Sequence, residues 1–351
     1  MKKTLALLCS LLLLFTLLLS SCKKETPLPG DAGHGSVTNS PNDESAPAKP
    51  DATLPVTVWT LNGTTGFGMA KLMDNAKNHT AALNYTFSVK TDATYIRDSI
   101  INGKGEGGEC PDIAAVPTNV AAALYNATNG GVKILAINTA GVLYLVTTNG
   151  QTPASLSELT GKTVYCPAQN PAFIAKALLQ KENLADRITL NTTDYADPTE
   201  LRTAVANGLV EYAILPEPMV TIAGKANARM KVAVDITAEW NQHFPANSLV
   251  QGCVIARTEF VNEHPAEVKK FLEEYKASID YVKANPDAAG TMIADNGIFA
   301  QAPVAKLAIP KCNLCYLSGE EMKAAMKAFL AEMPAASIGG KLPGDDFYFG
   351  A

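Results

Sequence analysis

The stretch Val56-Thr57-Val58-Trp59-Thr60-Leu61-Asn62-Gly63-Thr64-Thr65-Gly66-Phe67 decides how the rest of this chain is interpreted. Its β-branched, alternating first half predicts a strand, and an asparagine and two glycines then turn the chain into an apolar series that fits the start of a helix. Such a turn leaves backbone N–H groups and hydroxyls free to hold an anionic or oxygen-rich group. An ordinary strand-to-helix turn, with Thr64 or Thr65 as the N-cap, is an alternative explanation of this sequence pattern. Similar turns later in the chain favour the binding interpretation.

The first residues have the pattern of a secretory signal. Lys2 and Lys3 precede an almost unbroken apolar run over 5–19, and small residues then lead to Cys22. The pattern resembles a bacterial lipoprotein signal, so we expect a signal peptide over 1–21 and lipidation of Cys22. A retained membrane helix is the alternative, but the run is short for a span of about 20 residues. The segment 22–53, rich in Pro, Gly and Ser, is expected to be a flexible tether.

Composition limits the possible partners. Without Lys2 and Lys3, the 29 basic and 34 acidic residues leave a net charge of about −7, which disfavours nucleic acid as a partner. The roughly 300 residues beyond the tether exceed what one hydrophobic core usually serves, so two lobes are expected.

Strands and helices alternate along the folded region. The pattern predicts strands over 56–61, 85–89, 111–116, 131–137, 142–148, 161–166, 187–190, 210–215, 231–236 and 249–256. It predicts helices over 93–101, 120–126, 173–178, 199–208, 266–284, 287–294 and 320–333. This alternation indicates an α/β fold with mostly parallel sheets and helices on both faces, whose ligands sit beyond the carboxyl ends of the strands.

The two long apolar runs at 142–148 and 249–256 suit strands that cross between lobes. We therefore expect lobe 1 to comprise 54–142 and 250–351, and lobe 2, inserted into it, to comprise 143–249. The crossing strands would form the hinge, and the polar turns of both lobes would face one cleft.

Four motifs carry a resemblance to a known family. They are Leu61-Asn62-Gly63-Thr64-Thr65-Gly66, Asp112-Ile113-Ala114-Ala115-Val116-Pro117-Thr118-Asn119, Leu215-Pro216-Glu217-Pro218 and Gly339-Gly340-Lys341-Leu342-Pro343. As a set they resemble the type II periplasmic solute-binding proteins of ABC importers, closest to the nitrate/sulfonate/taurine group that includes thiamine-pyrimidine and riboflavin binders. The resemblance covers nearly all of 55–349, and the glycine-rich segment 103–111 departs from it.

The resemblance implies a substrate-binding lipoprotein that captures a small solute and delivers it to a membrane permease. It would be extracytoplasmic, anchored to the membrane by the lipid on Cys22, monomeric, without a cofactor and not an enzyme. A sensory or receptor lipoprotein on the same fold is the first alternative. The second is an enzyme resembling the thiamine-pyrimidine synthases, which depend on a histidine and metal-binding cysteines. No histidine lies in any predicted cleft turn.

The predicted ligand-binding residues lie in those turns and offer both donors and acceptors. They are Asn62, Gly63, Thr64, Thr65, Gly66, Thr118, Asn119, Asn138, Thr139, Tyr144, Gln169, Asn170 and Glu217. The turns contain no Lys or Arg, so the set suits a small polar, heteroaromatic or weakly charged molecule, with Phe173 among the candidate stacking surfaces. Glu217 either pairs with a ligand amine or is a solvated turn residue.

Cysteines and histidines provide no clear metal site. Five cysteines remain beyond Cys22, and Cys312-Asn313-Leu314-Cys315 has the spacing of a redox or metal motif. No second such pair exists and His79, His243 and His264 are scattered, so no metal is predicted. A disulfide is left open.

Overall fold

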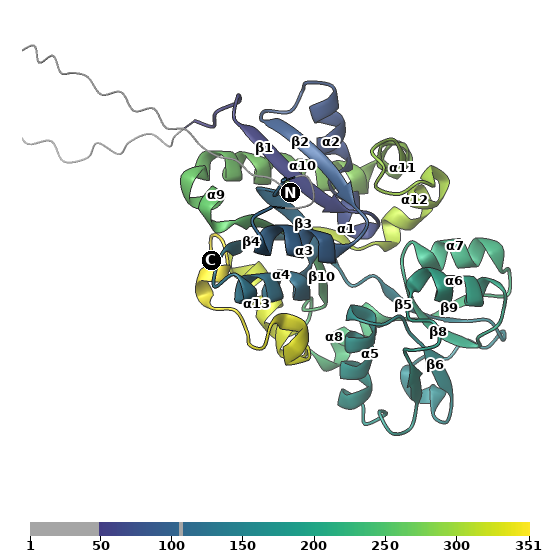
Figure 1. The fold of residues 1–351 in the computed structure, drawn as a ribbon. Coiled ribbons are helices and arrows are strands. Elements are labelled where there is room, and N and C mark those ends of the chain that lie inside the picture. The colour runs from purple at the N-terminus through teal and green to yellow at the C-terminus, as the bar shows by residue number, and fades with distance from the viewer. Residues whose placement is uncertain (1–48, 105–107) are drawn as a thin grey trace, which may run out of the picture. The chain divides into compact units, whose positions relative to one another are not determined.

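Two β-sheets with helices packed around them organise the residues described by this computed structural model, which are 49–104 and 108–351 (Figure 1). The first sheet has the order β11-β4-β10-β3-β1-β2 and the second the order β7-β6-β8-β5-β9. The first sheet contains β1 (Pro55–Leu61), β2 (Asn84–Lys90), β3 (Ile113–Pro117), β4 (Val132–Ala140), β10 (Val250–Arg257) and β11 (Leu314–Leu317). The second contains β5 (Leu143–Thr147), β6 (Thr163–Tyr165), β7 (Thr189–Asn191), β8 (Tyr212–Pro216) and β9 (Lys231–Asp235).

Thirteen α-helices lie in the described part of the chain. They are α1 (Thr64–Phe67), α2 (Ala70–Lys77), α3 (Ala93–Ile101), α4 (Thr118–Ala127), α5 (Asn170–Lys181), α6 (Pro198–Ala206), α7 (Met219–Ala226), α8 (Ile236–His243), α9 (Thr258–Glu263), α10 (Pro265–Ala284), α11 (Pro286–Asp295), α12 (Ala302–Ala308) and α13 (Gly319–Ala331). Short 3-10 turns include η2 (Ile309–Lys311) and η3 (Ala335–Ile338). None of the described helices combines the length and the apolar composition needed to cross a membrane.

The mixed α/β, two-lobe prediction is confirmed, but the expectation of mostly parallel sheets was wrong. Five of the nine strand pairings in the described residues are antiparallel, because β5 and β10 each lie between two antiparallel neighbours and β11 runs antiparallel to β4. β1 pairs in parallel with β2 and β3, and β6 pairs in parallel with β7 and β8. β10 runs antiparallel to β3 and β4, and β5 runs antiparallel to β8 and β9. Each of these two strands is the first that the chain forms after it passes from one sheet to the other.

The connections between the sheets are shorter than the predicted crossing strands. β5 pairs only within the second sheet and β10 only within the first, because each finds backbone partners on both of its edges there. The chain therefore passes between sheets at 141–142 and 244–249. The lobe boundaries proposed from the sequence stay a prediction.

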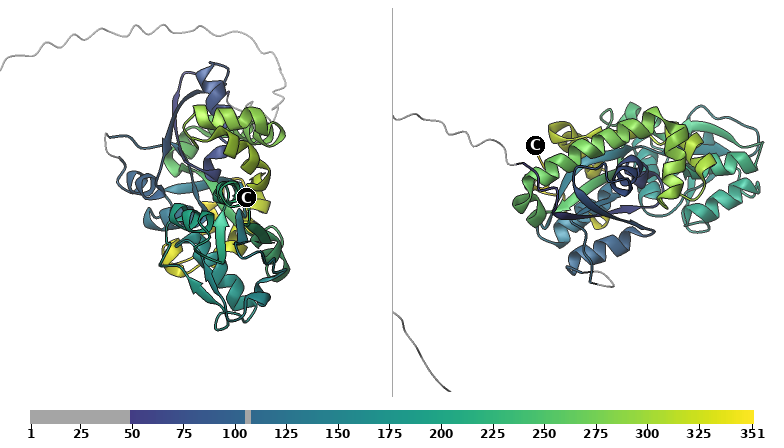
Figure 2. Two further views of the ribbon diagram at one scale, coloured as in Figure 1. Left: turned by 90° about the vertical axis from the view of Figure 1, so that its right-hand side faces the viewer. Right: turned by 90° about the horizontal axis from the view of Figure 1, so that it is seen from above.

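Helix α10 shows how side-chain spacing builds the core of the first lobe. Its apolar stripe from Val268 through Phe271 and Tyr275 to Val282 is fully buried, as a one-sided helical pattern requires. The helix begins at Pro265 and ends before Pro286, and it packs against α2, β4 and β11. It is the long green helix in the right-hand view of Figure 2.

One local prediction was wrong. Asn138–Gly141 was expected to be a turn, but β4 continues to Ala140 because β10 and β11 supply ladder partners to its polar end. The strand β11 was not predicted at all.

The predicted signal peptide (1–21), the lipidated Cys22 and most of the tether lie outside the described residues, as do 105–107 of the glycine-rich segment. The end of the tether is described: the Asp51 N–H donates to a Glu267 carboxylate oxygen at 2.8 Å. The last residues of the predicted tether are therefore in contact with α10. All five cysteines in the described residues are free thiols.

Candidate ligand-binding site

A cavity of about 660 Å³ opens between the first and second lobes. Its walls come from the N-terminal turns of α3, α4 and α5 and from the segment at η3. Another hollow, of about 380 Å³, is lined by the first lobe only, mainly by β2 and the C-terminal part of α2. The larger cavity is thus the one in which two lobes and several helix N-termini converge, and small-molecule sites occur preferentially between domains.

Two of the helices that face the cavity have uncapped N-termini. No side chain caps α4 or α5, whereas the Asp92 carboxylate caps α3 by accepting from the Thr94 N–H. The first N–H groups of a helix have no partner inside the helix and carry its positive end. The first turns of α4 and α5 can therefore donate to a ligand oxygen, from opposite lobes.

Asn119 and Asn170 add polar groups that need a partner. The side-chain oxygens of both residues are buried and accept no hydrogen bond, and both residues line the cavity. Asn119 is only 7% exposed, and its Nδ2 donates to the Ser337 carbonyl at 3.5 Å. A buried acceptor without a donor is costly, so each oxygen is suited to receive an N–H or O–H from a bound molecule.

Of the predicted site residues, the cavity brings together Asn119, Gln169 and Asn170. Gln169 adopts φ 65° and ψ −135° just before α5. Phe173, on the next turn of the same helix, supplies an aromatic surface in the cavity wall.

The sequence reasoning missed Arg97, which also lines the cavity. It considered only the turns for cations, whereas Arg97 lies within α3 and pairs with Asp98 at 2.8 Å. The helical spacing from Ala93 to Arg97 is one turn, which places both on one face. This spacing in the sequence could have indicated that Arg97 lies on the same side of the helix as Ala93.

Thr118, Asn138 and Thr139 are buried and are not among the residues that line the cavity. The Thr118 hydroxyl donates to the Val250 carbonyl at 2.8 Å. The Asn138 Nδ2 donates to the Tyr275 hydroxyl at 2.9 Å, and its oxygen accepts from Thr139. Their hydrogen-bonding capacity is used within the protein.

The turn at 62–66 is held by backbone contacts. The Gly63 N–H donates to the Ile298 carbonyl at 3.0 Å, and the Thr65 carbonyl accepts from the Asn138 amide at 3.3 Å. Gly63, at φ 83°, precedes α1, which is a single turn. Asn62, Thr64 and Thr65 have at least partly exposed side chains, but none of the turn lines the cavity.

Tyr144 and Glu217 meet the η2 segment of the first lobe instead. The Tyr144 hydroxyl donates to the Lys311 carbonyl at 2.8 Å. Glu217 is 2% exposed and accepts from both the N–H and the hydroxyl of Thr221. Burial raises the pKa of Glu217, while these hydrogen bonds and Lys311 oppose that rise. The alternative of a solvated turn residue was wrong, because this carboxylate is buried.

The two sheets, the inserted second lobe and the interlobe cavity define the type II periplasmic-binding-protein fold. Residues 129–289 match the family model described as NMT1/THI5 like. No curated protein matches the chain by sequence. The resemblance expected from the sequence motifs is thus confirmed by the family match and by the fold.

Solved structures share this architecture at low sequence identity. An ABC transporter protein of Parabacteroides distasonis is 22% identical, with a TM-score of 0.69 over 85% of this chain and 99% of that one. The periplasmic aliphatic sulphonate binding protein of Escherichia coli is 11% identical, with a TM-score of 0.63 over 83% and 92%. The periplasmic nitrate-binding protein of Synechocystis is 12% identical, with a TM-score of 0.58 over 86% and 85%.

Proposed function

We propose that this protein is the substrate-binding lipoprotein of an ABC importer and that it holds a small polar organic solute in the interlobe cavity. The observation that carries the proposal is the pair of unpartnered buried oxygens of Asn119 and Asn170, supplied to one cavity by opposite lobes. A molecule that donates to both would bridge the lobes. The similarity to solute-binding proteins for sulphonate and nitrate supports this role.

The lining favours a solute with several chemical features. N–H or O–H donors would satisfy the two asparagine oxygens, and a flat ring would lie against Phe173. An acidic group would face the first turns of α4 and α5 and the guanidinium of Arg97. The preference for a weakly charged solute rested on the absence of Lys and Arg in the turns, so Arg97 widens the proposal to acidic solutes.

Transport follows from hinge closure in this proposal. A ligand held by both lobes favours the closed form, and the short connections at 141–142 and 244–249 would absorb the bend. The closed form would then dock on a membrane permease. The lipid on Cys22 would keep the monomeric protein at the outer side of the membrane.

Binding rather than catalysis is the proposed activity. The cavity lining contains no His or Cys among the residues described, and its charged side chains are Asp92 and Arg97. Neither is arranged with a nucleophile or a second acid for general acid–base chemistry. A sensory role would use the same cavity, and the absence of a cognate permease gene nearby would favour that role.

The first test is thermal unfolding of the purified chain against sulphonates, nitrate, thiamine pyrimidines, flavins, aromatic acids and amines. A solute present at about 100 times its Kd adds about 2.7 kcal/mol to the unfolding free energy, which shifts Tm by a degree or more. A shift with one class supports the proposal and identifies the solute class. No shift with any member, for protein shown to be ligand-free, counts against it.

The second test places the solute in the cavity. Asn170→Ala should weaken binding of the active solute by about tenfold, because one hydrogen bond is worth about 0.5–1.5 kcal/mol. Asn296→Ala is the matched control, since its buried oxygen is also unpartnered but lines the other hollow. Equal affinities for Asn170→Ala and the unmodified protein would place the solute elsewhere.

A further inference from the structure

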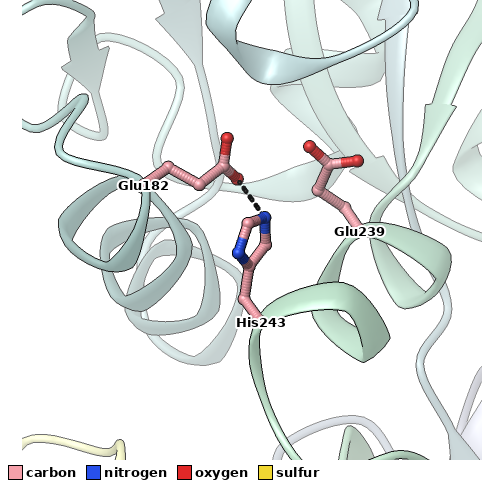
Figure 3. Close-up of side chains that lie close together, drawn as sticks. All are labelled: Glu182, Glu239 and His243. Atoms are coloured by element: carbon pink, nitrogen blue, oxygen red, sulfur yellow. Dashed lines mark ion pairs between the residues drawn. The ribbon is translucent and has the colours of Figure 1, made fainter.

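Three side chains outside the cavity converge on one point in the second lobe. One carboxylate oxygen of Glu182, one of Glu239 and one ring nitrogen of His243 all lie within 4.8 Å of one another (Figure 3). The His243 Nε2 is 3.6 Å from the Glu182 Oε1. Glu239 and His243 are four residues apart on α8, so they share one face of that helix.

Both carboxylates are poorly compensated. Glu239 is 5% exposed and the Glu182 side chain 10% exposed, and the Glu182 Oε1 accepts no hydrogen bond. Among the residues that the structure describes, the Glu239 Oε2 accepts from the Gln242 amide alone, at 3.4 Å. In the described part of the chain neither carboxylate forms an ion pair with Lys or Arg. Two buried carboxylates side by side call for a cation between them.

The backbone adds to the negative potential at this point. Glu182 directly follows the last residue of α5, and His243 is the last residue of α8. The C-terminal ends of helices carry partial negative charge and favour cations. Within the described residues, the neighbouring Lys181 forms no ion pair with either carboxylate, and its ammonium lies over the Phe244 ring at 5.6 Å.

We propose that Glu182, Glu239 and His243 form a binding site for one divalent metal ion, with Zn²⁺ as the best match. One imidazole and two carboxylates are a ligand set that Zn²⁺ accepts, at metal–ligand distances of about 2.0–2.2 Å. Ligand atoms that all lie within 4.8 Å of one another can reach a common ion with small side-chain rotations. A water molecule would complete a tetrahedron.

The site would act as a clamp rather than as part of the solute cavity. α5 has 12 residues, so its C-terminal end lies about 18 Å from the cavity residues at its N-terminus. A metal ion there would tie the end of α5 to the end of α8, two helices that already pack together. It would stabilise the second lobe whatever solute the cavity binds.

Zn²⁺ binding to the full-length, EDTA-treated chain tests the proposal by isothermal titration calorimetry. We expect one Zn²⁺ per chain with a micromolar or lower Kd and a rise in Tm on addition of Zn²⁺. Glu182→Gln and His243→Gln should each weaken binding at least about tenfold, because each removes a direct ligand. The two variants keep the test valid if one of them folds poorly.

His264→Gln is the matched control, because its ring contacts Phe260 in the first lobe, away from the three ligands. It should bind Zn²⁺ as tightly as the unmodified protein. Unchanged affinity in both cluster variants would overturn the proposal, as would a Kd above about 100 µM in the unmodified protein. Co²⁺ bound in place of Zn²⁺ shows whether a free thiol is a ligand. An intense near-ultraviolet band from a cobalt–thiolate bond would also overturn the proposal.

Discussion

The Lys311 ammonium lies 3.8 Å from the Glu217 carboxylate and joins the η2 segment of the first lobe to the end of β8 in the second. The carboxylate side chain is fully buried and the lysine is half exposed. Burial raises the pKa of Glu217, and Lys311 is among the groups that lower it. The pair is thus a contact between lobes whose strength depends on the ionisation of Glu217.

Lys311→Met should destabilise the protein in a pH-dependent way. A carboxyl whose pKa is higher in the folded state than in the unfolded state costs stability as pH rises above about 4.3, the usual glutamate value. Lys311 offsets part of that cost only where Glu217 is ionised. We expect a loss of about 0.5–1 kcal/mol at pH 7, measured by urea unfolding, and a smaller loss at pH 4.

Lys306→Met is the control for this variant. It removes an exposed ion pair with Asp287 and should change stability little at either pH. An equal loss at pH 7 and pH 4 for Lys311→Met would show that the lysine contributes by packing alone.

Tyr275→Phe tests whether Asn138 has a structural role. The Tyr275 hydroxyl is fully buried and accepts from the Asn138 amide. Its removal leaves a buried donor short of a partner, so we expect a loss of about 1–3 kcal/mol in unfolding free energy and no change in solute affinity. In Tyr281→Phe, a partly buried tyrosine on the same helix loses its hydroxyl, and stability should hardly change. Weaker solute binding by Tyr275→Phe would indicate that Asn138 contributes to the ligand-binding site.

Gln169→Gly should stabilise the protein while weakening binding. Gln169 has φ 65°, a conformation that glycine adopts readily and other residues adopt at a cost. The exposed side chain lines the cavity, so glycine should add about 1 kcal/mol of stability and remove a ligand contact. Gln169→Ala retains the strain and should lose affinity without the gain in stability. If the Tm of Gln169→Gly is no higher than the Tm of Gln169→Ala, the backbone at residue 169 is not strained.

Periodicity predicted those elements whose side chains alternate between core and solvent. The stripe of α10 was predicted correctly because burial of one face dictates its spacing. The strand β1 was predicted from its β-branched residues, although it is buried on both faces from Val58 to Leu61. The same reasoning failed at Asn138–Gly141, where polar residues continue a strand because Tyr275 and Thr65 satisfy the Asn138 side chain. Such partners are distant in sequence, so no local pattern marks them.

The candidate site was predictable only in part for a similar reason. Asn119 and Gln169 follow strands, and the rule about carboxyl ends of strands locates them. Arg97 and the three proposed metal ligands lie within or at the ends of helices. Glu239 and His243 have one-turn spacing, but 236–243 was not predicted to be a helix, and Glu182 joins them only through the packing of α5 on α8.

A double-mutant cycle on Asn119 and Asn170 offers the sharpest test of closure around a solute. The two residues come from opposite lobes and form no hydrogen bond with each other. Without solute, the stability changes of Asn119→Ala and Asn170→Ala should add to within about 0.5 kcal/mol. With the solute found in the panel, a bridging molecule should couple them by about 0.5–3 kcal/mol in binding free energy. Calorimetry on the four proteins measures the coupling, and additive losses of affinity would mean that the solute contacts the lobes independently.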